Sequence, residues 1–325
     1  MNILVTGGAG YIGSVAAQAL LDAGHSVTAL DSLVTGHAAA VPEGATLVKA
    51  DLADVPVLDR ALASGKFDAV LHFAAFIEAG ESMKDPARFY QNNLVNSLHL
   101  IDAARRAGID RFVMSSTAAV YQSSDEPLTE DSPLGPTNVY GHTKLMIEQA
   151  LDWFHRIHGL HFAALRYFNA CGAAPGRGEA HHPESHLIPR VLKVALGQEQ
   201  TANVFGTDYP TPDGTCIRDY INVSDLVAAH LLALDALAST GRLVYNLGSG
   251  TGYSVREVID TARAVTGHPI PVLESSRREG DAPRLVASSE KIRRELGWRP
   301  LHGSLREIVA SAWDWHRSHP HGYEG

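Results

Sequence analysis

The stretch Thr6-Gly-Gly-Ala-Gly-Tyr-Ile-Gly13 follows an apolar run at the N-terminus and leads into an amphipathic segment near Tyr11–Ala23. Gly7, Gly10 and Gly13 allow the backbone to turn tightly, and the N-terminus of a following helix presents free N–H groups to an anion. A glycine triplet alone is a weak signal, but this one has a predicted strand before it and a predicted helix after it. The stretch therefore predicts a loop that binds the pyrophosphate of a dinucleotide.

Short β-branched runs alternate with longer amphipathic segments through the first half of the chain. We predict strands over Asn2–Thr6, Ser26–Asp31, Thr46–Ala50, Ala69–His72, Arg111–Met114 and Phe162–Phe168, and helices near residues 11–23, 55–63, 86–107 and 138–158. Alternation at this spacing indicates a parallel sheet covered by helices on both faces. We therefore expect an α/β fold with a doubly wound parallel sheet of the Rossmann type in residues 1–170.

The pattern changes after Arg166. Residues 172–185 hold glycines, prolines and the pair His181-His182, and they are predicted to form a long loop. Further helices are predicted near residues 187–197, 224–238, 254–266, 288–296 and 304–316. We expect residues 171–325 to form a smaller, interleaved C-terminal substrate domain, with a segment at about 217–240 returning to the Rossmann domain.

The composition excludes some classes of partner. The chain has 325 residues, with 27 lysines and arginines against 36 aspartates and glutamates, and its formal net charge is −9. This balance argues against binding nucleic acid or a membrane surface through charge. Two cysteines cannot form a disulfide framework, and neither a signal-peptide pattern nor roughly 18 consecutive apolar residues occur. We expect a cytoplasmic protein with no nucleic-acid and no membrane partner.

Acidic residues follow two of the predicted strands. Asp31 ends the second strand, where a carboxylate accepts hydrogen bonds from both ribose hydroxyls and repels a 2′-phosphate. Asp51 and Leu52 follow the third strand, where an adenine would lie. The expected cofactor is therefore NAD rather than NADP.

A tyrosine and a lysine, Tyr140 and Lys144, lie four residues apart on one face of a predicted helix. The pKa of a free phenol is about 10, too high for a general base at neutral pH. We expect the ammonium group of Lys144, with a positively charged nicotinamide, to lower the pKa of Tyr140. Ser115 and Thr117 supply hydroxyls at the end of the fifth strand, where ligands of such sheets bind. Together these side chains predict a catalytic site.

Several motifs of the chain resemble those of a known protein family. The first set consists of the glycine loop, His72-Phe-Ala-Ala75, the pair Tyr140 and Lys144, and Arg166-Tyr-Phe-Asn169. These motifs look like those of the extended short-chain dehydrogenase/reductases. The second set consists of Phe205–Thr211, Asp213–Thr215, Arg218–Tyr220 and Arg278–Asp281. It narrows the resemblance to the UDP-hexose 4-epimerases of that family, and the resemblance spans essentially the whole chain.

The resemblance implies a reaction and a set of cofactor contacts. Members of this group keep NAD tightly bound and interconvert UDP-galactose and UDP-glucose through a 4-keto intermediate, with the tyrosine as base. Catalytic roles are then implied for Tyr140, Lys144 and Thr117. Cofactor contacts are expected from Gly7, Gly10, Tyr11, Ile12, Gly13, Asp31, Asp51, Leu52, Phe73, Ala74, Ala75, Asn92, Ser115, Tyr140, Lys144 and Tyr167.

The resemblance also implies which residues hold the substrate. Contacts to the UDP-sugar are expected from Thr117, Asn169, His186, Leu187, Phe205, Arg218, Arg278 and Asp281. Two arginines suit a pyrophosphate, because each guanidinium gives paired, charge-assisted hydrogen bonds. Phe205 matches a position near the uracil, and Asp281 matches one near its ribose.

Three positions depart from the family pattern. Thr117 stands where a serine is usual and keeps the hydroxyl, while Ile77 stands where a lysine is often found. Leu285 is intermediate between the large aromatic and the small residues that the family carries there. Turnover of UDP-N-acetylhexosamines or UDP-pentoses therefore stays open as an alternative.

Two other functions fit the sequence less well. A nucleotide-sugar dehydratase needs an acid/base pair beside the catalytic hydroxyl, and Ala118 and Ala119 stand there instead. A non-enzymatic dinucleotide sensor would typically lack the tyrosine or the lysine, and both are present.

No metal site is expected, because the sequence around His181, His182 and His186 has no known carboxylate–histidine metal spacing. His186 is instead expected to face the sugar or the diphosphate. A homodimer is expected by resemblance only, through the helices predicted near 86–107 and 138–158. The apolar residues on these helices can equally pack on their own sheet.

Overall fold

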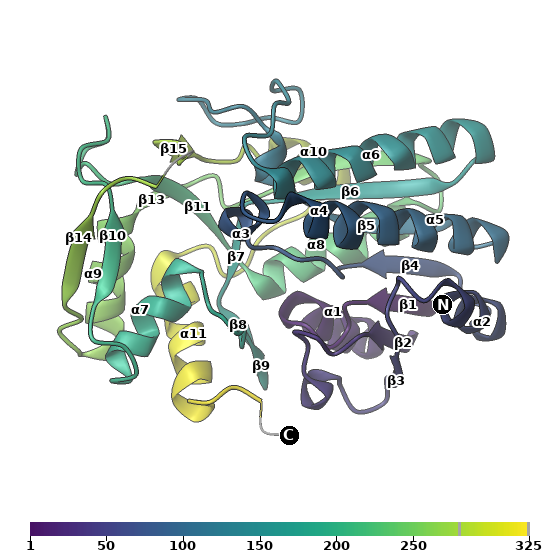
Figure 1. Ribbon diagram of the computed structural model, residues 1–325, viewed down its shortest axis with the longest axis horizontal. Helices are drawn as coiled ribbons and strands as arrows, with labels where there is room; N and C mark the ends of the chain where they lie inside the picture. Colours follow the sequence, from purple (N-terminus) through teal and green to yellow (C-terminus); the bar gives the residue numbers. More distant parts are fainter. Residues whose placement is uncertain (279–280, 324–325) are drawn as a thin grey trace.

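A seven-stranded parallel sheet forms the centre of the larger part of the molecule, in a computed structural model that describes residues 1–278 and 281–323 (Figure 1). The strand order is β12-β6-β5-β4-β1-β2-β3, and all neighbouring pairs are parallel. The strands are β1 (Asn2–Thr6), β2 (Ser26–Asp31), β3 (Thr46–Lys49), β4 (Ala69–His72), β5 (Arg111–Thr117), β6 (His161–Tyr167) and β12 (Arg242–Leu247). The predicted doubly wound parallel sheet is confirmed.

Helices cover both faces of this sheet. One face carries α1 (Tyr11–Asp22) and α8 (Val223–Ala236), and the other carries α2 (Val55–Gly65), α5 (Asn96–Arg106) and α6 (Val139–His158). Along β1, Ile3 and Val5 pack in the first core and Leu4 packs in the second. Because both faces are buried, the strands are apolar without alternation, as the sequence indicated.

The helix predicted near 86–107 is interrupted in the structure. It consists of α4 (Pro86–Phe89), a π-helical segment at Tyr90–Val95, and α5. Within the π-helical segment, the side chain of Asn93 makes two hydrogen bonds to the backbone of Phe76, at 2.8 and 2.9 Å. Asn93 on the wide π-helical turns thus fixes the loop after β4 by hydrogen bonds. The periodicity of apolar residues does not predict such a π-helical segment.

The second part of the molecule contains shorter strands and several helices. A small sheet contains β7 (Asn169–Cys171), β11 (Ile217–Asn222), β13 (Gly252–Ser254) and β15 (Arg284–Leu285), and β10 (Ala202–Phe205) pairs with β14 (Val272–Ser275). The hairpin β8 (Ala173–Ala174) and β9 (Arg177–Gly178) lies in the predicted loop. The helices of this part are α7 (Leu187–Ala195), α9 (Val255–Thr266) and α11 (Leu305–Ser318). Helix α10 (Glu290–Leu296) packs on the first part beside β12, and the short α3 (Ala79–Ser82) also belongs to the first part.

The chain crosses between the two parts several times. Strand β7 follows directly on the central strand β6 and pairs with β11 in the small sheet. Helix α8 follows β11 and packs beside α1, and β12 then joins the edge of the central sheet. Figure 1 shows β7, β8 and β9 between the central sheet and the group of α7, α9 and α11. These crossings bring the second half of the chain against the carboxyl ends of the central strands.

Among the helices that the structure describes, we find none with the length and apolar character needed to cross a membrane.

Candidate functional site

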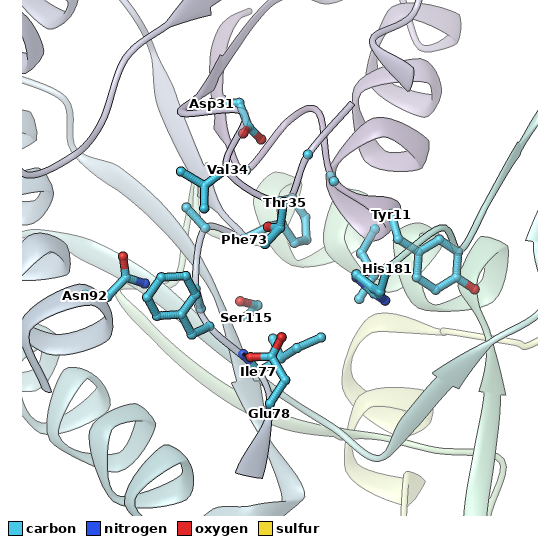
Figure 2. A pocket seen from close by; sticks show the side chains of 18 of the residues that line it. Tyr11, Asp31, Val34, Thr35, Phe73, Ile77, Glu78, Asn92, Ser115 and His181 are labelled. Atoms are coloured by element: carbon cyan, nitrogen blue, oxygen red, sulfur yellow. Dashed lines mark hydrogen bonds between the residues drawn. The ribbon is translucent and has the colours of Figure 1, made fainter. Parts of the chain in front are cut away.

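A pocket lies where the central parallel strands end. Most of its walls lie at or directly after the carboxyl ends of β1 to β6, which is where ligands of open α/β sheets bind, and the start of α6 and the segment before α7 supply much of the rest. Figure 2 shows Asp31, Asn92 and Tyr11 around it. The sequence-predicted cofactor residues all line it: Gly7, Gly10, Tyr11, Ile12, Gly13, Asp31, Asp51, Leu52, Phe73, Ala74, Ala75, Asn92, Ser115, Tyr140, Lys144 and Tyr167.

The glycine loop forms one wall and leaves no room for side chains. Gly7 has a φ of 71°, and a Cβ added there would lie 2.6 Å from the backbone nitrogen of Ala74. A Cβ added at Gly13 would lie 2.0 Å from the carbonyl oxygen of Gly7. The loop thus packs against the start of α1 and against the segment after β4. This cradle of backbone N–H groups suits a pyrophosphate.

Asp31 is the acidic group at the end of β2. Its side chain is buried and accepts hydrogen bonds from the backbone nitrogens of Ala9, at 3.0 Å, and Leu33, at 2.8 Å. These bonds fix the carboxylate beside the glycine loop, while each carboxylate oxygen keeps a lone pair for another donor. The residues Ser32, Val34, Thr35 and Gly36 also line the pocket, and the sequence analysis did not include them. Their position directly after Asp31 was the available signal.

Two features of the sequence bring the catalytic candidates together. Asn138 caps α6 by accepting a hydrogen bond from the backbone nitrogen of Gly141 at 2.8 Å. A Cβ at Gly141 would lie 2.3 Å from the carbonyl oxygen of Ala119, so glycine permits the close approach. The start of α6 therefore packs against the end of β5, and the Thr117 side chain lies near enough to the Tyr140 phenol to act on its pKa.

Lys144 binds β5 rather than the phenol. Its Nζ donates to the carbonyl oxygen of Ser115 at 2.9 Å and to the Ser115 hydroxyl at 3.2 Å. Burial lowers the pKa of Lys144 to about 7, although the carboxylate of Glu148 opposes this shift. The lysine is thus held at the pocket by β5, one helical turn from Tyr140.

In the protein without a bound nicotinamide, the pKa of Tyr140 is raised and not lowered. Burial raises this pKa to about 12, the Thr117 hydroxyl lowers it in part, and the charge of Glu78 raises it again. The lowering expected from Lys144 together with a positively charged nicotinamide therefore stays a prediction for the loaded pocket. Glu78 also lines the pocket, and sequence analysis missed it.

The residues expected to hold the substrate fall into two groups. Thr117, Asn169 and His186 line the pocket. The lining residues that the structure identifies do not include Leu187, Phe205, Arg218, Arg278 or Asp281.

The second group belongs to the smaller part of the molecule and makes contacts within itself. The guanidinium of Arg278 lies 3.9 Å from the ring centre of Phe205. The guanidinium of Arg218 lies 3.3 Å from a carboxylate oxygen of Asp281. Glu279 and Gly280 of the predicted Arg278–Asp281 motif lie outside the described residues.

Two predicted contact residues use their hydroxyls inside the protein. Tyr11 donates a hydrogen bond to the carbonyl oxygen of Gly172 at 2.7 Å. The hydroxyl of Tyr167 hydrogen-bonds to Nε2 of His230. Both tyrosines can therefore offer the pocket their rings rather than their hydroxyls.

The fold and the pocket define a dinucleotide-binding α/β protein with a tyrosine–lysine pair on a helix beside the glycine loop. A family model, the NAD dependent epimerase/dehydratase family, matches residues 3–248. The chain belongs to this family.

Known relatives match along the whole chain. A UDP-glucose 4-epimerase of Corynebacterium glutamicum is 49% identical, over 96% of this chain and 95% of that protein. A solved structure of a UDP-glucose 4-epimerase matches with a TM-score of 0.97 and 47% identity, over 100% of both chains. Another, from Bifidobacterium longum in complex with NAD+ and UDP, has a TM-score of 0.95 and 36% identity, over 99% of this chain and 100% of that chain. The resemblance stated from the sequence motifs is confirmed.

Proposed function

We propose that the chain is a UDP-glucose 4-epimerase that interconverts UDP-galactose and UDP-glucose through a 4-keto intermediate. The observation that carries the proposal is the meeting of Tyr140, Thr117 and Lys144 in the pocket that the glycine loop also lines. Relatives that bear this name are 45–49% identical to the chain over nearly its full length.

The pocket fits NAD on two grounds. The loop at Gly7 and Gly13 excludes side chains and offers backbone N–H groups, and Asp31 offers a fixed carboxylate that disfavours a 2′-phosphate. When bound, NAD supplies a reversible hydride acceptor for C4 of the sugar. We assign the cofactor contacts to the residues predicted from the sequence, with Lys144 beside the nicotinamide ribose.

Tyr140 is proposed as the group that takes the proton from the sugar 4-hydroxyl and returns it. The raised pKa of Tyr140 keeps the phenol protonated in the protein alone, so positive charge in the loaded pocket must favour the phenolate. The Thr117 hydroxyl, which lies near the Tyr140 phenol, is proposed to position the same substrate oxygen. Lys144 adds charge from its anchored place on β5.

The UDP group is assigned to the smaller part of the molecule. We propose that Arg218 and Arg278 bind the diphosphate with Asn169, His186 and Leu187, and that Phe205 and Asp281 lie near the uridine. Both arginines already lie beside partners in this part of the chain, Asp281 and Phe205, which orients their guanidinium groups. A firm hold on the UDP leaves the sugar free to turn over in the pocket.

We also propose a homodimer through α5 and α6. Some apolar residues of the helices predicted near 86–107 and 138–158 pack inside the chain, among them Phe89, Leu145 and Leu151. On α6, however, Trp153 and Ile157 lie four residues apart and are 60% and 66% exposed. An exposed apolar pair on one helix face suits a partner helix.

Incubation of the purified protein with UDP-galactose tests the enzymatic proposal. We expect UDP-glucose to form with unchanged mass, whereas a dehydratase would yield a product lighter by one water. Formation of no UDP-glucose would contradict the proposal. The same assay with UDP-N-acetylgalactosamine and UDP-arabinose determines which sugars the protein accepts with leucine at position 285.

A further inference from the structure

Four potential metal ligands converge at the rim of the pocket, on the segment between β9 and α7. Glu179, His181, Glu184 and His186 each offer one ligand atom, and these atoms lie within 4.8 Å of one another. Nδ1 of His186 lies 2.7 Å from an oxygen of Glu179 and 2.9 Å from an oxygen of Glu184. Nδ1 of His181 lies 3.0 Å from the same oxygen of Glu179. The spacing of these carboxylates and histidines along the sequence matches no known metal motif, and the fold brings them together.

The two carboxylates of this cluster are almost fully withdrawn from water. Only 5% of the Glu179 side chain and 2% of the Glu184 side chain are exposed. Two buried carboxylates carry a charge of about −2 that the interior must balance. The single N–H at Nδ1 of His186 can point at only one of the two carboxylate oxygens beside it. Protonated imidazoles would therefore leave one of these short contacts without a well-aligned hydrogen bond.

The contacts around the cluster hold its ligands in place. The carboxylate of Glu184 accepts hydrogen bonds from the backbone nitrogens of Ser185, at 2.7 Å, and His186, at 2.8 Å. The carbonyl oxygen of Glu179 accepts a hydrogen bond from the Trp315 indole at 3.2 Å. Fixed outer contacts of this kind orient the ligands of metal sites.

We propose that Glu179, His181, Glu184 and His186 form a structural site for one divalent transition-metal ion, with zinc as the preferred ion. Two imidazole nitrogens and two carboxylate oxygens suit zinc, whereas calcium and magnesium prefer oxygen ligands alone. Ligand bonds of roughly 2.0 to 2.2 Å need only small shifts of these side chains. The charge of the ion balances the two carboxylates.

Four protein ligands leave no open coordination position, so the site is structural rather than catalytic. The ion joins residues 179–186 into one closed unit at the edge of the pocket. Figure 2 shows His181 beside Tyr11, close to the glycine-loop wall. Because His186 directly precedes α7, the ion also fixes the start of this helix. This inference is independent of the proposed reaction.

Metal analysis of the untagged protein tests the proposal. After removal of loosely bound ions by dialysis, we expect about one zinc ion per chain, as for a four-ligand structural site. The double variant Glu179→Gln, Glu184→Gln should lose it. The variant His182→Gln is the matched control, because it removes a histidine of the same segment that lies outside the cluster, and it should retain the zinc.

X-ray absorption at the zinc edge of the unmutated protein provides a second readout if the double variant fails to fold. The spectrum should show nitrogen and oxygen neighbours with imidazole scattering and no sulfur neighbours. Zinc far below one ion per chain, even after incubation with zinc and desalting, would overturn the proposal. Equal zinc in the double variant and the control would also overturn it.

Discussion

Tyr140 is the residue on which the chemistry depends. Replacing it by phenylalanine removes the proton-transfer group and leaves the ring and the helix in place. We expect turnover of UDP-galactose to fall by roughly 100- to 10,000-fold, the usual contribution of a general acid–base group. NAD content, measured after denaturation of the purified variant, should be unchanged.

Tyr245→Phe is the matched control for that substitution. The Tyr245 hydroxyl donates to Glu295 at 2.9 Å, on the edge strand β12 and away from the pocket. Its loss should leave turnover intact. Equal activity of Tyr140→Phe and Tyr245→Phe would reject Tyr140 as the base.

His72 makes the stability of the fold depend on pH in the acidic range. It is buried between the hydroxyls of Thr6, at 2.7 Å, and Ser97, at 2.8 Å. Burial, aided by the charge of Lys144, lowers the pKa of His72 to about 3. The unfolded chain, with an ordinary histidine pKa of about 6.5, binds a proton that the folded chain does not, so stability falls as the pH drops from about 6.5 towards 3.

The variant His72→Asn should reduce this loss. One pKa unit corresponds to about 1.4 kcal/mol, so His72 accounts for about 2 kcal/mol of the difference in unfolding free energy between pH 7 and pH 5. Urea denaturation at both pH values measures this difference, with His158→Asn as the control for an exposed imidazole. An unchanged difference in His72→Asn would show that His72 titrates in the folded state.

At the residue scale, the sequence predicted which side chains carry the chemistry but not their interactions. Tyr140, Lys144 and Thr117 were named from spacing and resemblance. The hydrogen bonds of Lys144 to Ser115 depend on how α6 packs on β5, and no local pattern reports this packing. Glu179 and Glu184 were missed as partners of the histidines because their convergence depends on the path of the segment between β9 and α7.

At the scale of elements, the turn from β1 into α1 decides whether the cofactor binds. In Gly13→Ala the added Cβ would lie 2.0 Å from the carbonyl oxygen of Gly7, and backbone cannot yield as a flexible side chain can. We expect the purified variant to contain little or no NAD. Gly80→Ala is the control, because a Cβ at this exposed position in α3 meets nothing within 4 Å.

The control variant should keep its NAD and gain up to about 1 kcal/mol of stability, since alanine loses less backbone entropy than glycine in a helix. Full NAD content in Gly13→Ala would contradict the structure of the loop.

Element prediction succeeded where patterns were local and strong. The runs at β1, β2 and β4 have the predicted bounds. The edge strand β12 was missed because it pairs with β6, which ends 75 residues before β12 begins. The strands β7 to β10 were missed because they have only two to four residues, too few for a periodic signal. Strand β11 was missed although it has six residues, and its partners β7, β13 and β15 lie far away in the sequence. The π-helical segment was missed because it arises from the contact between Asn93 and Phe76.

On the scale of the whole molecule, the exposed face of α6 leads to a prediction about assembly. Sedimentation equilibrium should give twice the chain mass for the parent protein. The double variant Trp153→Glu, Ile157→Lys should give the mass of a single chain, because charges would face the partner helix. Leu301→Glu, which alters an exposed leucine outside α5 and α6, should remain dimeric. A monomeric parent protein would contradict the proposed dimer.

In the proposed reaction, one pocket removes the hydrogen from C4 of the sugar and returns it to the opposite face. The most direct test uses UDP-galactose labelled with deuterium at C4, incubated with the purified protein in ordinary water without added NAD. We predict UDP-glucose that keeps the deuterium at C4, as measured by mass spectrometry and NMR. Loss of the label to water, or the absence of UDP-glucose, would contradict the account.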